Sequence, residues 1–300
     1  MSIIPDLMFE RDKLREQIRR WKWLFLVILL ILVVFITKDT NVSPNNKEII
    51  ARIRIEGVID HDKDLTKKLK EIGDNPRIKA VLLHVDSPGG VAYAGENLYI
   101  ELKRLSEKKP VVSVLETLAA SAGYMIALGT DYIVARNMTI TGSIGVIWQS
   151  FEMVEMANKL GINFVSVKSS PLKAAPNPME KITPDAKAAT KQSIDDSYDV
   201  FLAMLMEGRS MKKTKALKLA NGQVYTGRRA KELGLIDEIG AEEEAVAWLE
   251  KNKNISPQAT IVDINWSKPT GMFKEISQFF HNSNKMIMQM FGTSSSLMAK

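Results

Sequence analysis

Residues 111–128, "VVSVLETLAASAGYMIAL", pass from a strand pattern to a helix pattern through a stretch of small side chains. The apolar run Val111–Leu115 is typical of a buried strand, and Ser121–Leu128 has the apolar face of a helix. One hydroxyl, that of Ser121, stands between them and is followed by Ala-Gly. The small residues indicate either that two backbones pack closely here or that a ligand must reach the hydroxyl.

The same alternation of strand and helix extends on both sides of this stretch. Ile78–Val85 is a short, mostly apolar run typical of a buried parallel strand, and it ends at the turn signal "DSPGG". A helix is predicted over 92–105 and a strand over 131–135. Such β–α alternation predicts an α/β fold, a mostly parallel sheet with right-handed crossovers and flanking helices. Further strands are expected over 49–59 and 162–167, and further helices over 62–72, 151–160, 184–208, 214–223, 226–234 (stopped by Gly234) and 242–252.

Composition limits the class of protein. The chain has 300 residues, of which 45% are hydrophobic and 25% charged, so most of it should be globular. The net charge is +6, but basic residues are spread between acids, which argues against nucleic-acid binding and fits solubility or attraction to anionic membranes. There is no cysteine, which excludes disulfides, zinc–thiolate sites and cysteine nucleophiles.

The amino terminus carries a predicted membrane anchor. "WLFLVILLILVVFI", Trp23–Ile36, has no charged or polar side chain. At ~1.5 Å per residue it spans about 21 Å, short of the ~30 Å hydrocarbon core, and flanking residues extend it to 21–37. The alternative is a cleaved signal peptide, but no small-x-small site follows Ile36, which favours retention. Residues 1–20 hold the basic residues Arg11, Lys13, Arg15, Arg19 and Arg20, which predict a cytoplasmic amino terminus and a main domain across the membrane.

Two short motifs could take part in a chemical reaction. Gly89 and Gly90 follow a buried strand, where glycine lets backbone N–H groups approach an anion closely; the alternative is a plain turn. Ser121 lies at a predicted helix start, where unpaired N–H groups favour negative charge; the alternative is an N-cap serine. The sequence is not the Gly-x-Ser-x-Gly elbow, because Ala119 replaces the first glycine.

A serine nucleophile needs a base, and the histidines are poor candidates. His84 precedes Asp86 by two residues on one predicted strand, so a Ser–His–Asp relay is conceivable but badly placed. We expect His84 to be a satisfied core or groove residue. The other candidate is Lys173 in "SVKSSPLKAAPNPME", residues 166–180, with apolar neighbours and no acid within several residues. A buried amine loses proton affinity and can act as a base, although most lysines are simply solvated.

Five motifs then occur in a recognisable order and spacing. They are "HVDSPGG", "AASAGYMIALGTDYIVA", "TGSIGV", "KSSPLKAAPNPME" followed by "ITPDA", and "NGQVYTGRRAKELGLIDEIG". Together they resemble the signal peptide peptidase A family, also called protease IV, in its short single-repeat form. The resemblance covers about Ile49–Trp248 and implies a crotonase/ClpP-like peptidase domain, which we place at 48–252.

The resemblance also implies roles for individual residues. Ser121 matches the family's nucleophile and Lys173 its base, while Ser143 is expected to orient the lysine. The glycine pair matches Gly89 and Gly90, which with the N–H of Ala122 would hold the oxyanion. No metal or cofactor is expected. Two departures affect substrate preference and loop conformation rather than the dyad: Ala122 replaces a usual glycine, and Ala174 replaces a common aspartate.

The implied activity is that of a membrane-anchored serine endopeptidase that degrades cleaved signal peptides or other hydrophobic peptides. Alternatives are a crotonase-type acyl-CoA enzyme, a stomatin-directed membrane protease and a non-catalytic scaffold. The resemblance places the protein in the bacterial inner membrane with its catalytic domain on the extracytoplasmic side. It also implies a ring- or dome-shaped homo-oligomer, with an octamer as one candidate, and leaves open whether the dyad forms within or between chains. The tail, 253–300, is predicted to be an amphipathic helix or an oligomer contact.

Overall fold

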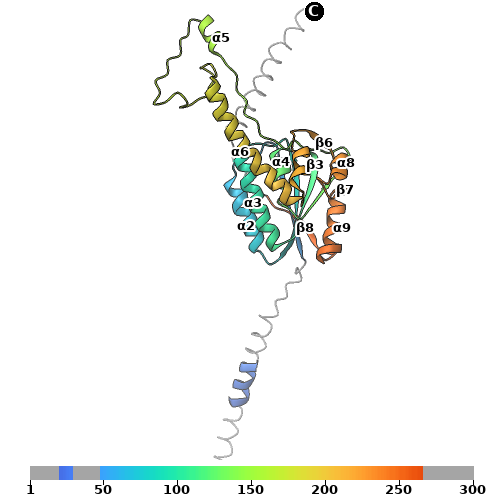
Figure 1. The fold of residues 1–300 in the computed structure, drawn as a ribbon. Coiled ribbons are helices and arrows are strands. Elements are labelled where there is room, and N and C mark those ends of the chain that lie inside the picture. The colour runs from blue at the N-terminus through green and yellow to red at the C-terminus, as the bar shows by residue number, and fades with distance from the viewer. Residues whose placement is uncertain (1–19, 30–47, 266–300) are drawn as a thin grey trace, which may run out of the picture. The chain divides into compact units, whose positions relative to one another are not determined.

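The computed structural model describes residues 20–29 and 48–265 (Figure 1). The chain divides into two compact units, Met1–Lys47 and Glu48–Lys300. In the first unit, residues 20–29 form a helix whose side chains are exposed. Within the described ranges, no helix has both the length and the apolar character that a membrane crossing needs. The predicted segments 1–20 and 253–300 fall largely outside the described residues, and so does the part of 21–37 that follows residue 29.

The second unit is built on a mostly parallel sheet, as the alternation predicts. Its described part has eight strands in the order β6-β5-β3-β2-β1-β8, with β4 and β7 branching from β3. All pairs are parallel except β5 with β6. The strands are β1 (Ile49–Glu56), β2 (Ile78–Ser87), β3 (Val111–Ala120), β4 (Tyr132–Ala135), β5 (Ile140–Gly142), β6 (Val224–Thr226), β7 (Glu238–Ile239) and β8 (Thr260–Asp263).

Helices cover both faces of this sheet (Figure 1). The larger apolar cluster joins one sheet face to most of the helices, and a smaller cluster joins the other face to α9. Each fully buried leucine or valine contributes about 1.5–3 kcal/mol, so these two clusters hold the sheet between its helices. The helices are α2 (Lys63–Asp74), α3 (Ala92–Lys108), α4 (Ala122–Ala127), α5 (Val154–Lys159), α6 (Pro184–Gly208), α7 (Lys213–Leu219), α8 (Gly227–Leu233) and α9 (Glu242–Lys253).

Side-chain alternation and capping explain these elements. Along β2, Leu83 belongs to the larger cluster and Leu82 to the cluster under α9, because successive strand residues face opposite ways. Asp62 caps α2 by accepting the Leu65 N–H at 2.8 Å. Gly234 ends α8 in the left-handed conformation, as predicted.

The region between β5 and α6 differs from the prediction. The strand expected over 162–167 is absent, and the helix expected over 151–160 is shortened to α5. Val165 and Val167 are 82% and 97% exposed, so this apolar segment does not pack against the sheet. A strand without a partner leaves its backbone N–H and C=O groups unpaired, which accounts for the irregular conformation.

We refer to residues 146–183 as the arm. None of its residues is buried. The arm leads into α6, a helix of 25 residues and therefore about 37 Å long. Most buried residues of α6 lie near its carboxyl end, between Phe201 and Leu205, where the helix packs on the domain. In Figure 1, α5 lies near the amino end of α6, whereas the sheet lies near the carboxyl end.

Candidate active site

Ser121 lies between β3 and α4 in an uncommon backbone conformation. Its φ of 54° and ψ of −122° are costly for a residue other than glycine, at about 1–3 kcal/mol. Three backbone hydrogen bonds hold it there. The Ser121 N–H donates to the Gly142 carbonyl at 2.9 Å, and the Ser121 carbonyl accepts from the N–H groups of Tyr124 and Met125. The half-buried serine is thus fixed at a sharp strand-to-helix turn, an arrangement common at functional sites.

Gly89 lies against the side chain of Ser121. A Cβ atom at Gly89 would lie 2.8 Å from Ser121 Cβ and 3.1 Å from its hydroxyl oxygen, and φ at Gly89 is +112°. A Cβ atom at Gly90 would lie 1.9 Å from the carbonyl oxygen of Ile59. Both positions therefore require glycine, and the pair brings its backbone next to the serine.

Close backbone packing explains the other small residues around Ser121. A Cβ atom at Gly123 would lie 2.9 Å from the Ser87 carbonyl oxygen, and one at Gly95 would lie 2.9 Å from Ala122 Cβ. Gly95 therefore makes room for Ala122, the residue that departs from the family's usual glycine. The structure confirms the close-packing interpretation of the small residues, because Gly89, Gly95 and Gly123 each leave no room for a side chain.

The backbone N–H groups near Ser121 differ in availability. The Gly89 N–H already donates to the Ser87 hydroxyl at 3.1 Å. Gly90 is exposed, and no hydrogen bond among the described residues engages its N–H. Ala122 is the first residue of α4, so its N–H has no partner within the helix. Of the three donors predicted from the sequence, those of Gly90 and Ala122 have no hydrogen-bond partner among the described residues.

The buried helix α4 is anchored by Tyr124. This side chain is fully buried, and its hydroxyl donates to the Leu235 carbonyl at 2.6 Å. Burial raises the pKa of Tyr124 well above its ordinary value, so the hydroxyl stays protonated and keeps donating. The anchor fixes α4, and with it the turn at Ser121.

Ser143 and Lys173, the other two predicted residues, differ in their relation to Ser121. Ser143 follows Gly142, which accepts the Ser121 N–H, and its own N–H donates to the Gln223 carbonyl at 2.8 Å. Lys173 lies in the arm and is exposed, which corrects the burial expected from its apolar neighbours. No hydrogen bond or ion pair among the described residues joins Lys173 to Ser121 or Ser143. The single chain brings together five of the six predicted residues and leaves the lysine apart.

The arm is internally bonded and carries many exposed apolar side chains. Its Met153 N–H donates to the Pro178 carbonyl at 2.8 Å, and Lys168 pairs with Glu180. Exposed apolar surface of this extent marks an interaction site in soluble domains. The large exposed apolar residues of the arm are Ile147, Trp148, Phe151, Met156, Leu160, Ile162, Phe164, Val165, Val167, Leu172, Met179 and Ile182.

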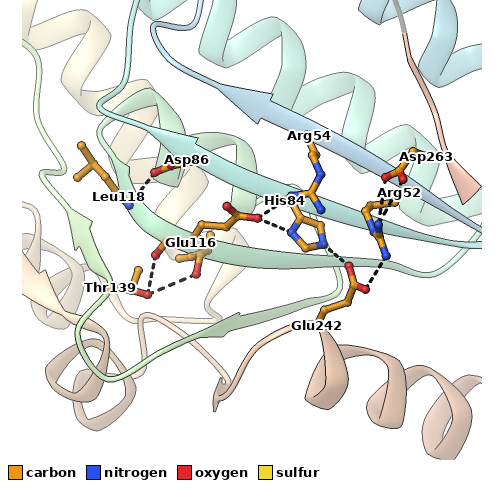
Figure 2. A network of polar contacts seen from close by, with 10 residues as sticks. Arg52, Arg54, His84, Asp86, Glu116, Leu118, Thr139, Glu242 and Asp263 are labelled. Atoms are coloured by element: carbon orange, nitrogen blue, oxygen red, sulfur yellow. Dashed lines mark hydrogen bonds and ion pairs between the residues drawn. The ribbon is translucent and has the colours of Figure 1, made fainter. Parts of the chain in front are cut away.

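His84 is a satisfied groove residue, as predicted, and it serves a different part of the molecule. Its Nδ1 contacts Glu116 at 2.6 Å and its Nε2 contacts Glu242 at 2.7 Å (Figure 2). Arg54 also binds Glu116, and Arg52 also binds Glu242. No pattern in the sequence points to either glutamate, because only the fold brings β3 and the start of α9 to His84. With both ring nitrogens engaged, His84 has none left to accept a proton from Ser121.

A cleft of about 550 Å³ on the α9 face of the sheet is lined by Arg54, His84, Glu116 and Glu242. Arg54, His84 and Glu116 come from the carboxyl-terminal halves of three adjacent strands, and Glu242 comes from α9. The strands bear apolar side chains nearer their amino ends, where α9 covers them. The cleft therefore begins where the apolar packing of α9 ends.

Comparisons with known proteins show which sequences this chain resembles. Residues 103–256 match peptidase family S49. A candidate protease from Synechocystis sp. is 36% identical over 216 residues, covering 71% of this chain and 78% of that protein. A candidate signal peptide peptidase SppA from Enterococcus faecium is 32% identical over 243 residues, covering 76% and 70%. A solved membrane-bound stomatin-specific protease covers 74% of this chain and 99% of its own at 16% identity and a TM-score of 0.45, a likeness too distant to bear on function.

Proposed function

The chain belongs to peptidase family S49, and we propose that it is a serine endopeptidase in which Ser121 is the nucleophile and Lys173 the base. The observation that carries the proposal is the position of Ser121. Its strained turn is fixed by three backbone hydrogen bonds, and the backbone of Gly89 lies directly against its side chain. Family membership and the protease names of the relatives favour peptide hydrolysis over the acyl-CoA alternative.

In the first half of the proposed reaction, the Ser121 oxygen attacks the carbonyl carbon of the peptide bond and its proton passes to the neutral Lys173 amine. The carbonyl oxygen becomes an oxyanion, which accepts from the N–H groups of Gly90 and Ala122. Loss of one such donor typically costs about 2.7–4 kcal/mol of transition-state stabilisation. The C–N bond then breaks, and Lys173 returns the proton to the leaving amine.

In the second half, water attacks the ester carbon while Lys173 takes one of its protons. The C–O bond to Ser121 breaks, the peptide acid leaves, and the lysine returns the proton to the serine oxygen. Ser143, next to the Gly142 carbonyl that fixes Ser121, would hold the amine of the lysine in place.

We place the lysine of one copy of the chain at the serine of a neighbouring copy. The support is the exposure of Lys173, the internal bonding of the arm and the apolar side chains that the arm leaves uncovered. Assembly into a closed homo-oligomer would cover that surface and would desolvate the amine, which favours its neutral form.

The substrates proposed are cleaved signal peptides and other hydrophobic peptides. The support is the predicted anchor at 21–37, which would hold the site beside the membrane where such peptides remain. The basic residues before the anchor favour a cytoplasmic amino terminus and an extracytoplasmic catalytic domain in a bacterial inner membrane. Because the chain has no cysteine, single-cysteine variants Ser2→Cys and Lys253→Cys test this orientation with an impermeant thiol reagent. Labelling of only the second variant in intact spheroplasts supports it, and labelling of only the first contradicts it.

The catalytic assignment is tested by labelling the full chain with a fluorophosphonate and mapping the adduct by mass spectrometry. We expect the adduct on Ser121, no adduct in Ser121→Ala, and slow labelling in Lys173→Ala. Lys159→Ala is the matched control, because Lys159 is another exposed lysine of the arm. Labelling of a different serine, or equal rates in the two lysine variants, would refute the assignment.

A further inference from the structure

Strand β3, which ends one residue before Ser121, contains a bulge. Val85 of β2 pairs with Leu115, but Ser87 pairs with Ala119. One residue of β2, Asp86, thus lies opposite three residues of β3, 116–118. We refer to residues 116–118 as the bulge.

The bulge is also the point at which β3 changes partner on its other side. Before it, Val112–Leu115 pair with β4, and from its last residue onward, Leu118–Ala120 pair with β5. The last pair joins Ala120 to Gly142, the residue whose carbonyl accepts the Ser121 N–H. The shape of the bulge therefore sets where the end of β3 meets β5, and this determines the position of the serine.

Side chains, rather than a regular ladder, hold the bulge (Figure 2). The Leu118 N–H donates to the Asp86 carboxylate at 3.0 Å. The Thr139 hydroxyl donates to the Glu116 carbonyl at 2.7 Å, and Thr139 is only 3% exposed. Without these two side chains, a backbone donor and a backbone acceptor of the bulge would lose their partners.

A third contact fixes the side chain at the start of the bulge. The Glu116 carboxylate accepts from His84 at 2.6 Å and from Arg54 at 2.9 Å. Side chains of β1 and β2, together with Thr139 just before β5, therefore hold the bulge in place. Bulges often change the direction of a strand next to an active site. Here the bonds hold the part of β3 that leads to Ser121.

We propose that Asp86 and Thr139 are positioning residues for Ser121. They contact neither the serine nor a substrate; they fix the bulge and so hold the end of β3 in register with β5. The end of β2 continues from Asp86 through Ser87, whose hydroxyl accepts the Gly89 N–H, to the glycine pair. Asp86 therefore links the position of the nucleophile to that of the oxyanion donors. The inference rests on the proposed role of Ser121.

The test compares Asp86→Ala with Asp131→Ala in the full chain. Asp131 is a matched control, because its carboxylate accepts the Val111 N–H at 2.7 Å at the opposite end of the same strand. Both variants lose one carboxylate–backbone bond of β3, but only Asp86 lies at the serine end. The readouts are the melting temperature, the rate constant for fluorophosphonate labelling of Ser121, and kcat and KM for a hydrophobic peptide.

We expect Asp86→Ala to lower the labelling rate and kcat by about 10-fold or more with little change in KM, since a displacement near 1 Å can cost about 10²-fold. Asp86→Asn, which keeps an acceptor oxygen, should retain most of the rate. Asp131→Ala should lower the melting temperature but leave the labelling rate unchanged. Equal labelling of folded Asp86→Ala and wild type would overturn the proposal.

Thr139 supplies a second variant in case Asp86→Ala does not fold. Thr139→Val removes the hydroxyl at almost constant volume and should slow labelling, whereas Thr139→Ser should restore it. An unchanged rate in Thr139→Val would overturn its positioning role. Labelling of the wild-type chain separates the nucleophile role of Ser121 from the positioning role of Asp86 and Thr139. If Ser121 is not labelled in the wild-type chain, the proposed function fails. If Ser121 is labelled at the same rate in the wild-type chain and in the Asp86 and Thr139 variants, only the positioning role fails.

Discussion

Substitution of Gly89 by alanine is the most direct perturbation of the space beside Ser121. The new Cβ atom would lie 2.8 Å from Ser121 Cβ, 3.1 Å from its hydroxyl oxygen and 3.1 Å from the Ala120 carbonyl oxygen. Carbon atoms in contact prefer about 3.5–4.0 Å, so the serine must move by roughly 1 Å. A misplacement of that size can cost about 10²-fold in rate. We therefore expect fluorophosphonate labelling of Ser121 to fall by about two orders of magnitude.

Gly57→Ala separates this crowding from backbone strain. Gly57 also has a positive φ, +77°, but a Cβ atom there would meet no atom within 4 Å. Strain at such positions costs about 1–2 kcal/mol, so both variants should melt at lower temperatures. Only Gly89→Ala should lose labelling when both are assayed well below their melting temperatures. A folded Gly89→Ala variant that labels at the wild-type rate would refute the geometry described for the site.

Two further predictions concern stability. His84→Ala leaves Glu116 and Glu242 without the imidazole between them, and we expect a loss of about 1–3 kcal/mol in urea unfolding; an unchanged midpoint would contradict this. Burial, together with the hydrogen bond to Glu238, raises the pKa of Tyr132 from 10.0 to about 12, so its neutral form is favoured in the folded state. That stability is complete below pH 10 and is lost as the pH rises from about 10 to about 12, because the unfolded chain ionises first. Unfolding measured across that interval should show a smaller alkaline loss in Tyr132→Phe, and an identical loss would show that another group is responsible.

Local patterns were sufficient to predict most of the fold. The apolar run at Ile78–Val85 and the helix stop at Gly234 depend on alternation and on left-handed capping, which are properties of neighbouring residues. The same holds for Ser121 and the glycine pair, which are continuous with the ends of two adjacent strands. Where contacts are local or the strand order is simple, sequence spacing places the residues correctly.

Other features depend on contacts between distant segments and could not be predicted. The apolar pattern at 162–167 resembles a strand, but the segment pairs with no strand among the described residues. The partners of His84 lie 32 and 158 residues away. The bulge in β3 shows only in the pairing of β3 with its neighbouring strands, which the sequence of β3 alone does not reveal. The apolar neighbours of Lys173 in the sequence predict a buried amine, but the lysine is exposed. Its burial depends on what packs against the arm.

The central claim, that Ser121 of one copy works with Lys173 of another, is tested most directly by mixing two inactive variants. Ser121→Ala and Lys173→Ala chains are prepared separately, co-assembled, and assayed for hydrolysis of a hydrophobic peptide. Mixed assemblies should recover activity, because some interfaces join an intact serine to an intact lysine, whereas each variant alone stays inactive. If the mixture assembles and remains as inactive as its components, the serine and lysine do not pair across copies.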